Sequence, residues 1–237
     1  MAKGFAKNGA KIMIADLNEA AALQTIKEIE EAGGTAAFTK TNVMNVAECQ
    51  NLVDETVKAF GGVHILLNIA GICKGDELFN STEAIYDLTM GVNVKGMLFL
   101  SEAAARVMKE QPEKGTIINV CSTSGYISSS TPMIAYDISK GAVRMLTMTM
   151  ANWYAQYGIR VNAIAPATTM TDMVRNAFEP GYWETPKALV NYPLGRIAET
   201  DDHLNAMLFL CSEDAGYING QILKVDGGNT MAYRNML

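Results

Sequence analysis

Short apolar runs alternate with helical stretches along the whole chain, and this alternation limits the possible folds more than any other feature. We expect strands at 11–15, 35–41, 63–67, 116–120, 159–165 and 221–225. Helices are expected between them, starting near residues 18, 45, 81, 136 and 200. Strands that alternate with helices form a mostly parallel sheet covered on both faces. The sequence therefore predicts an α/β fold with a doubly wound, Rossmann-like parallel sheet.

The chain shows no linker, internal repeat or low-complexity tract, so residues 1–237 are expected to form a single domain. Its 49% hydrophobic and 19% charged residues predict a substantial core. A net charge of −6 disfavours a nucleic-acid or anionic membrane partner, and no apolar run approaches a membrane span. The four scattered cysteines form no Cys-x-x-Cys pair, which favours free thiols in a reducing cytoplasm.

Tyr136 and Lys140 lie four positions apart in the expected helix at 136–157, so both side chains project from one helix face. An ammonium close to a phenol favours the phenolate and lowers the tyrosine pKa from its reference value of about 10. Such a tyrosine can exchange a proton with a substrate hydroxyl or carbonyl. The same spacing also arises by accident, so the pair needs support from other motifs.

Five further motifs accompany this pair in order along the chain: Asn68-Ile-Ala-Gly71, Asn93-Val-Lys-Gly96, Ser122-Thr-Ser-Gly125, Pro166 to Thr171, and Val225-Asp-Gly-Gly228. Each motif is weak by itself. Together, and on these expected elements, they resemble the motifs of the short-chain dehydrogenase/reductase family, and the resemblance runs from residue 1 to about residue 229.

The resemblance implies that the chain interconverts a secondary alcohol and a ketone by hydride transfer to or from a nicotinamide. Ser122 would bind the substrate oxygen, and Tyr136 would transfer its proton as general acid or base. Lys140 would tune the tyrosine and bind the nicotinamide ribose, and Asn93 would hold a water beside the lysine. Alternatively, Ser122 caps a turn and Asn93 bonds only to its own backbone.

Asp16 closes the first expected strand, where the resemblance places the residue that binds the adenosine ribose. A carboxylate there accepts from the 2′- and 3′-hydroxyls and repels a 2′-phosphate, and Leu17 follows it where an arginine would favour the phosphorylated cofactor. We therefore expect NAD, although Asp16 could also merely cap the next loop. The resemblance implies further cofactor contacts from Asn42, Val43, Asn68, Ala70, Gly71, Tyr136, Lys140, Pro166, Thr169 and Thr171.

Only 15 residues precede Asp16, and they contain no glycine-rich phosphate loop. In the related fold the strand order is 3-2-1-4-5-6-7, so we expect the first strand and its loop to be absent and Met1 to be an internal position of a longer protein. The absence would leave two inner strand edges about 10 Å apart, with unpaired backbone groups on both. We expect this chain alone to bind NAD weakly or fold poorly, and a version extended by roughly 20 residues to bind it.

The resemblance also makes the segment 170–197 a substrate lid, in which Tyr182 and Trp183 either contact substrate or anchor the loop. A polar Ser/Thr run before Tyr136 favours a polyol, a sugar or a small hydroxy or keto compound. The competing interpretation is a non-catalytic or fragmentary family member that acts as a binding or structural subunit.

His64 is expected in the core and His203 in solvent, and neither suits a Ser-His-Asp hydrolase; no motif indicates a metal. The helices at 94–111 and 136–157 carry apolar residues on more than one face, among them Met97, Phe99, Met145 and Met148. The resemblance implies that one such face packs against a second subunit, so we expect a homodimer or homotetramer.

Overall fold

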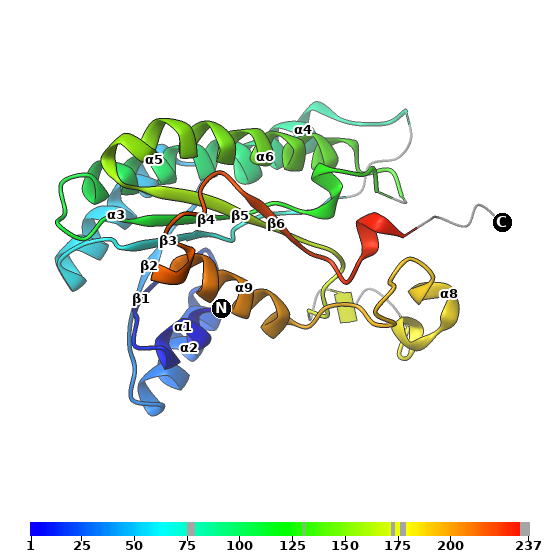
Figure 1. Cartoon of the computed structure of the whole chain (residues 1–237), viewed down its shortest axis with the longest axis horizontal. Coiled ribbons are helices and arrows are strands. Elements are labelled where there is room, and N and C mark those ends of the chain that lie inside the picture. Colours follow the sequence, from blue (N-terminus) through cyan, green and yellow to red (C-terminus); the bar gives the residue numbers. More distant parts are fainter. Residues whose placement is uncertain (75–78, 130, 172–173, 176–178, 233–237) are drawn as a thin grey trace.

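The computed structural model describes residues 1–74, 79–129, 131–171, 174–175 and 179–232. In this part of the chain six parallel strands lie between two layers of helices (Figure 1). The strands are β1 (Lys11–Asp16), β2 (Thr35–Lys40), β3 (Ile65–Asn68), β4 (Thr116–Val120), β5 (Arg160–Pro166) and β6 (Ile222–Val225). The α/β class with a parallel, Rossmann-like sheet is thereby confirmed.

Helices cover both faces of the strands (Figure 1). One face packs against α3 (Val46–Phe60), α5 (Met97–Met108) and α6 (Ile134–Tyr154). The other face packs against α1 (Ala2–Lys7), α2 (Glu19–Glu31) and α9 (Thr200–Cys211). Other helical elements are α4 (Glu83–Met90), η1 (Gly91–Gly96), η2 (Thr123–Gly125), η3 (Ala155–Tyr157), η4 (Tyr182–Glu184), α8 (Pro186–Leu189), η5 (Glu213–Ala215) and η6 (Asn229–Met231).

Local signals set the helix ends. The side chain of Asn18 accepts a hydrogen bond from Ala21 N at the start of α2, and that of Asn45 accepts from Ala47 N at the start of α3. Gly61 ends α3 with a φ of 87°, a left-handed conformation that glycine adopts without steric cost. These caps fix where α2 and α3 begin and where α3 ends.

The strands form two separate sheets, β1–β2 and β3–β4–β5–β6. Within the described residues no strand lies between β1 and β3, so each of these two strands has one ladder partner. The gap between the two sheets lies where the expected order 3-2-1-4-5-6-7 places its first strand. It also explains burial: β4 and β5 are buried along most of their length, whereas β1 and β3 are only partly buried.

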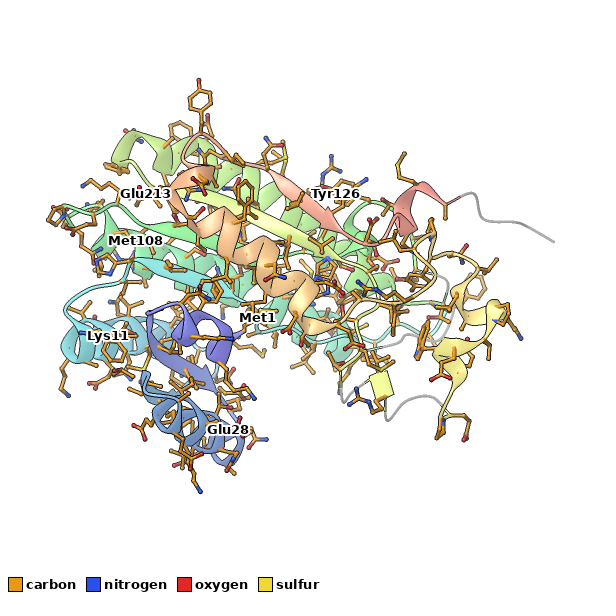
Figure 2. All side chains as sticks on the ribbon, turned by 60° about the horizontal axis from the view of Figure 1, so that its bottom comes forward. Met1, Lys11, Glu28, Met108, Tyr126 and Glu213 are labelled. Carbon is orange, nitrogen blue, oxygen red and sulfur yellow. The ribbon has the colours of Figure 1, made fainter. Side chains whose placement is uncertain are left out.

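Two hydrophobic clusters join the two sheets. On the α3/α5 face, Met13 of β1 and Leu66 of β3 pack against the same cluster. On the α9 face, Ile12 of β1 and Leu67 of β3 pack against another, and Met1 joins them beside α9 (Figure 2). Both sheets therefore lie in one layer, with β1 as the strand of the smaller sheet that is nearer to β3.

The structure corrects the expected places of both histidines. His64 is exposed just before β3, and His203 is buried on α9. The expected helical region at 81–111 is real but is interrupted by the π-helical segment η1. No helix of the described part of the chain is long and apolar enough to span a membrane.

Candidate active site

The loops that follow β3, β4 and β5 meet at one edge of the larger sheet, because the carboxyl ends of parallel strands lie together. They carry residues 68–71, Ser122 and residues 166–171. The first turns of α6 pack against η2, directly after Ser122, and bring Tyr136 and Lys140 to the same edge. The structure thus gathers residues that lie far apart in the sequence.

Ser122, Tyr136 and Lys140 form a compact group. The Ser122 hydroxyl is hydrogen-bonded to Tyr136, and it also accepts from Ser124 N at 3.1 Å. Lys140 Nζ lies 5.5 Å from the centroid of the Tyr136 ring and donates to the carbonyl of Val120 at 2.9 Å. A hydroxyl, a phenol and an ammonium thus converge, as proton transfer to a substrate oxygen requires.

Burial dominates the acid–base properties of this group. Burial raises the pKa of Tyr136 to about 12, and the hydrogen bond from Ser122 lowers it only in part. Burial also lowers the pKa of Lys140 to about 8. The expectation that the tyrosine pKa is lowered is therefore wrong for this structure, because desolvation of the phenolate raises the pKa by more than the hydrogen bond from Ser122 lowers it.

Asn93 is buried in η1 and clamps the loop after β3. Its Oδ1 accepts from Ile72 N at 2.8 Å, while its Nδ2 donates to Ile72 O at 2.9 Å and to Ser139 Oγ at 3.0 Å. A Cβ on Gly71 would lie 3.3 Å from Asn93 Oδ1 and 3.7 Å from Lys140 Nζ, so this glycine lets the loop approach both groups. Irregular helical turns of this kind are frequent at functional sites. The water expected at Asn93 stays a prediction.

Asp16 ends β1 at the carboxyl edge of the smaller sheet. Its Oδ1 accepts from Asn18 N at 2.8 Å, so it does cap the following loop. Its Oδ2 has no hydrogen-bond partner among the described residues and can still accept from a ribose hydroxyl. Asn42 and Val43 follow β2 at the same edge; Asn42 Oδ1 accepts from Met44 N, and Val43 packs against Gly96.

The other expected cofactor residues fall into two groups. Asn68 is buried and donates to Ser101 Oγ and Asn119 Oδ1, both at 2.8 Å, so its side chain serves the core. Ala70 and Gly71 are exposed at the carboxyl edge. Pro166 ends β5, Thr169 lies just beyond it, and Thr171 Oγ1 accepts from Val174 N at 3.3 Å.

The hydrogen-bonding groups at the two edges suit the two ends of a nicotinamide dinucleotide. Lys140 is 4% exposed, and its ammonium has one acceptor within the described ranges, Val120 O, for three N–H groups. Two donors therefore remain for ribose hydroxyls. At the other end, Asp16 offers a carboxylate oxygen. Among the described residues no glycine-rich turn lies between these two ends, where a pyrophosphate would sit.

The expected lid is only partly described, because residues 172–173 and 176–178 lie outside the described residues. In the described part, Trp183 contacts the rings of Tyr182 and Tyr192 edge-on. Tyr192 OH donates to Thr168 Oγ1 at 2.7 Å. These aromatic residues tie the segment to the end of β5.

Sequence reasoning missed His203. Its Nε2 lies 2.7 Å from Thr169 Oγ1, so α9 contributes directly to the site. The signal is present in the sequence: His203, Met207 and Leu210 are spaced i, i+4, i+7 and form the buried stripe of α9. No group of three His, Cys, Asp or Glu side chains that could hold a metal occurs in the described ranges, and all four cysteines are free.

Comparisons with known proteins agree with the observed fold and show the family. A family model described as enoyl-(acyl carrier protein) reductase matches residues 1–230. An uncharacterized oxidoreductase of Thermotoga maritima is 38% identical over 229 residues, which cover 95% of this chain and 90% of that protein. L-rhamnose 1-dehydrogenase (NAD(P)(+)) of Azotobacter vinelandii is 35% identical over 231 residues, covering 96% of this chain and 90% of that protein.

A solved structure is similar over nearly the whole chain. The gluconate 5-dehydrogenase of Burkholderia cenocepacia, in complex with NADP and tartrate, superposes with a TM-score of 0.90 at 33% identity. The match covers 98% of this chain and 90% of that one. The likeness in fold therefore extends over both sheets.

Proposed function

Because the chain belongs to the short-chain dehydrogenase/reductase family, we propose that it is an NAD-dependent enzyme that interconverts a secondary alcohol and a ketone. The observation that carries this proposal is the convergence of Ser122, Tyr136 and Lys140 at the carboxyl edge of the larger sheet. The first experiment measures NADH formation from NAD and an alcohol panel. Turnover that depends on Tyr136 supports the proposal, and turnover independent of it contradicts the proposal.

In the proposed mechanism, Ser122 and Tyr136 bind the same substrate oxygen. The raised pKa of Tyr136, about 12, keeps its proton in place at neutral pH, ready for transfer to a ketone oxygen. When the alcohol is oxidised, the phenol first releases this proton to solvent, and the resulting phenolate takes up the hydroxyl proton of the alcohol. A bound nicotinamide would supply the hydride chemistry at the substrate carbon, so the residues of this chain would contribute orientation and electrostatics.

Lys140 contributes charge and hydrogen-bond donors. With a pKa of about 8 it is protonated at neutral pH, and its charge over the Tyr136 ring favours any negative charge that develops on the phenol oxygen. The two N–H groups not used by Val120 O would bind the nicotinamide ribose hydroxyls. Asn93 supports both roles by holding the loop around Gly71 against the lysine.

The choice of NAD rests on Asp16 and Leu17. A carboxylate at the end of β1 repels a 2′-phosphate, and the exposed Leu17 offers it no positive charge. The relatives do not decide between NAD and NADP. The name of the rhamnose dehydrogenase includes NAD(P), and the gluconate 5-dehydrogenase structure holds NADP. We expect a higher kcat/KM with NAD than with NADP. Asp16→Ser should bring the two kcat/KM values closer together. An equal or higher value with NADP would contradict the choice.

We further propose that the substrate is a polyol, a sugar or a small hydroxy or keto compound. The loop before Tyr136 is rich in hydroxyls and is fixed by Asp137, which accepts from Ser129 N and Ser129 Oγ at 3.0 and 2.6 Å. Relatives whose names refer to rhamnose and gluconate are consistent with this class. A panel of polyols, sugars, sugar acids and small ketones tests it; turnover confined to large apolar alcohols would contradict it.

One observation favours a second candidate, a family member that serves as a binding or structural subunit. Within the described residues no strand lies between β1 and β3 to support a phosphate-binding turn. A rise in melting temperature with NAD distinguishes the two candidates, because only a form that binds NAD gains stability from it.

The four free cysteines also support a reducing, cytoplasmic location as part of the proposal.

We also propose that the protein forms a homodimer or homotetramer through α6. This helix covers the sheet with one side and exposes an apolar stripe on another, which includes Ile138, Met145 and Met148. Met145 is 60% exposed and Met148 43%, which is unusual for large apolar side chains on a helix. A second copy of the same helix would cover this stripe symmetrically.

A further inference from the structure

His203 reaches the candidate active site from the opposite layer of helices. It lies on α9, is 4% exposed, and places Nε2 2.7 Å from Thr169 Oγ1. Thr169 follows the carboxyl end of β5, at the edge that carries Tyr136 and Lys140. A buried histidine thus contacts the site without belonging to the group that would transfer the proton.

The neighbouring contacts determine which nitrogen carries the hydrogen. The Thr169 hydroxyl donates its single proton to Ala167 O at 3.1 Å, so its oxygen can only accept from His203. Nε2 must therefore carry a hydrogen. Nδ1 is buried and has no hydrogen-bond partner within the described residues, which suits a bare lone pair better than an N–H. His203 is thus neutral, with its hydrogen on Nε2.

The nearest carboxylate does not change this assignment. Asp202 is engaged by Arg196 through two hydrogen bonds of 2.6 and 2.9 Å, and it accepts a third from Glu199 N. Burial of His203 outweighs the charge of Asp202 and lowers the histidine pKa. The neutral form therefore persists at neutral pH.

The backbone around Thr169 is held as well. Met170 N donates to Ala198 O at 2.7 Å, and Ala198 N donates to Thr168 O at 3.1 Å. Among the described residues, His203 adds the one side-chain donor that reaches the Thr169 hydroxyl. With its proton given to Ala167 O and one lone pair given to His203, this hydroxyl retains a single free acceptor position.

We propose that His203 is a positioning residue that fixes the Thr169 hydroxyl as an acceptor for the carboxamide N–H of the nicotinamide. This inference rests on the proposed function, together with the contact between Thr169 and the nicotinamide carboxamide that the family resemblance implies. The polarity has a consequence for recognition: NAD presents an N–H to Thr169, whereas nicotinic acid adenine dinucleotide presents a carboxylate. His203 thereby contributes to selection of the amide cofactor.

The experiment compares His203→Phe with His203→Gln in the full chain. Phenylalanine fills the buried space but cannot donate, whereas the glutamine amide nitrogen reaches about as far as Nε2. We expect His203→Phe to weaken NAD binding about 3- to 10-fold, as loss of one neutral hydrogen bond predicts, with kcat at saturating NAD changed less than about twofold. His203→Gln should restore the affinity. The preference for NAD over its nicotinic acid analogue should fall in His203→Phe alone.

Tyr192→Phe is the matched control, because it removes a bond of the same 2.7 Å length from the adjacent Thr168. It should leave the preference between the two dinucleotides unchanged. In the Thr169→Val background, His203→Phe should have no further effect on NAD affinity. If His203→Phe fails to fold, His203→Asn replaces it, since its shorter amide cannot reach Thr169.

Amide exchange without cofactor separates this inference from the proposed function. Faster exchange of the Met170 amide in His203→Phe, restored in His203→Gln, supports positioning of the segment by His203. Unchanged exchange, or unchanged NAD affinity in a wild-type chain that does bind NAD, would overturn the inference. A wild-type chain that binds no NAD would overturn the proposed function instead, while the exchange result still decides the role of His203.

Discussion

Lys140 holds its ammonium over the ring of Tyr136, 5.5 Å from the ring centroid and one turn further along α6. The lysine is buried and donates to a single described acceptor, the carbonyl of Val120. A buried ammonium with so few partners is costly for stability and useful for electrostatics. The buried ammonium of Lys140 therefore lowers the stability of the fold and also provides the positive charge that the proposed proton transfer at Tyr136 uses.

Lys140→Met should abolish activity without destabilising the fold at neutral pH. Burial lowers the pKa of Lys140 from 10.5 to about 8, which corresponds to a cost of up to about 3 kcal/mol below pH 8. Because the unfolded chain binds the proton more tightly, this cost fades as the pH rises from about 8 to 10.5. Urea unfolding at both ends of that range checks the prediction. A variant clearly less stable than wild type at pH 7 would contradict it.

His203 should make the fold less stable in mild acid. Its pKa is lowered from 6.5 by burial, so the unfolded chain takes up a proton first as the pH falls, and stability declines below about pH 6.5. His203→Gln should remove this part of the decline, measured as unfolding free energy between about pH 7 and pH 5. His64→Gln is the control because His64 is exposed. An equal decline in wild type and His203→Gln would show that the decline has another source.

The open edges of β1 and β3 predict a response to an added strand. Each strand has one ladder partner, and each unpaired buried backbone group costs about 1–3 kcal/mol. We expect an N-terminal extension of roughly 20 residues, carrying an apolar strand and a glycine-rich turn, to raise the melting temperature and tighten NAD binding. An extension of equal length with prolines in the strand is the control. Equal melting temperatures and equal NAD affinities with and without the added strand would refute this account of the split.

The apolar stripe on α6 predicts self-association. Met145→Glu places a charge in the middle of the stripe and should shift the protein toward monomers in light scattering. Leu23→Glu on α2, also an exposed apolar position, should leave the association state unchanged. A wild-type chain that is monomeric at micromolar concentration would count against the proposed interface.

Regular elements could be predicted where one pattern dominates. The strand at 116–120 and the helix at 200–211 agree with β4 and α9 residue for residue, because a strand buried on both faces and a capped amphipathic helix leave few alternatives. The region 81–111 is different. Its helical periodicity is clear, but the π-helical turn around Asn93 depends on contacts with the loop after β3, which periodicity does not contain.

Side-chain environments were harder to predict than elements. His64 precedes a strand with one open edge and is exposed, whereas His203 faces the sheet from α9; both were expected in the opposite environment. The spacing to Lys140 predicts a lowered pKa for Tyr136, yet burial of its phenol raises that pKa. These properties arise from tertiary packing, which spacing along one helix does not reveal.

The most direct test of the central claim is turnover by Tyr136→Phe, measured beside wild type with NAD and the most active alcohol of the panel. Phenylalanine keeps the ring and removes only the transferable proton, so binding of NAD, followed by titration, should remain. We expect turnover to fall by roughly 10²–10⁴-fold, the usual contribution of general acid–base catalysis. A loss smaller than tenfold, with NAD still bound, would contradict the assignment of Tyr136 as the proton-transferring residue.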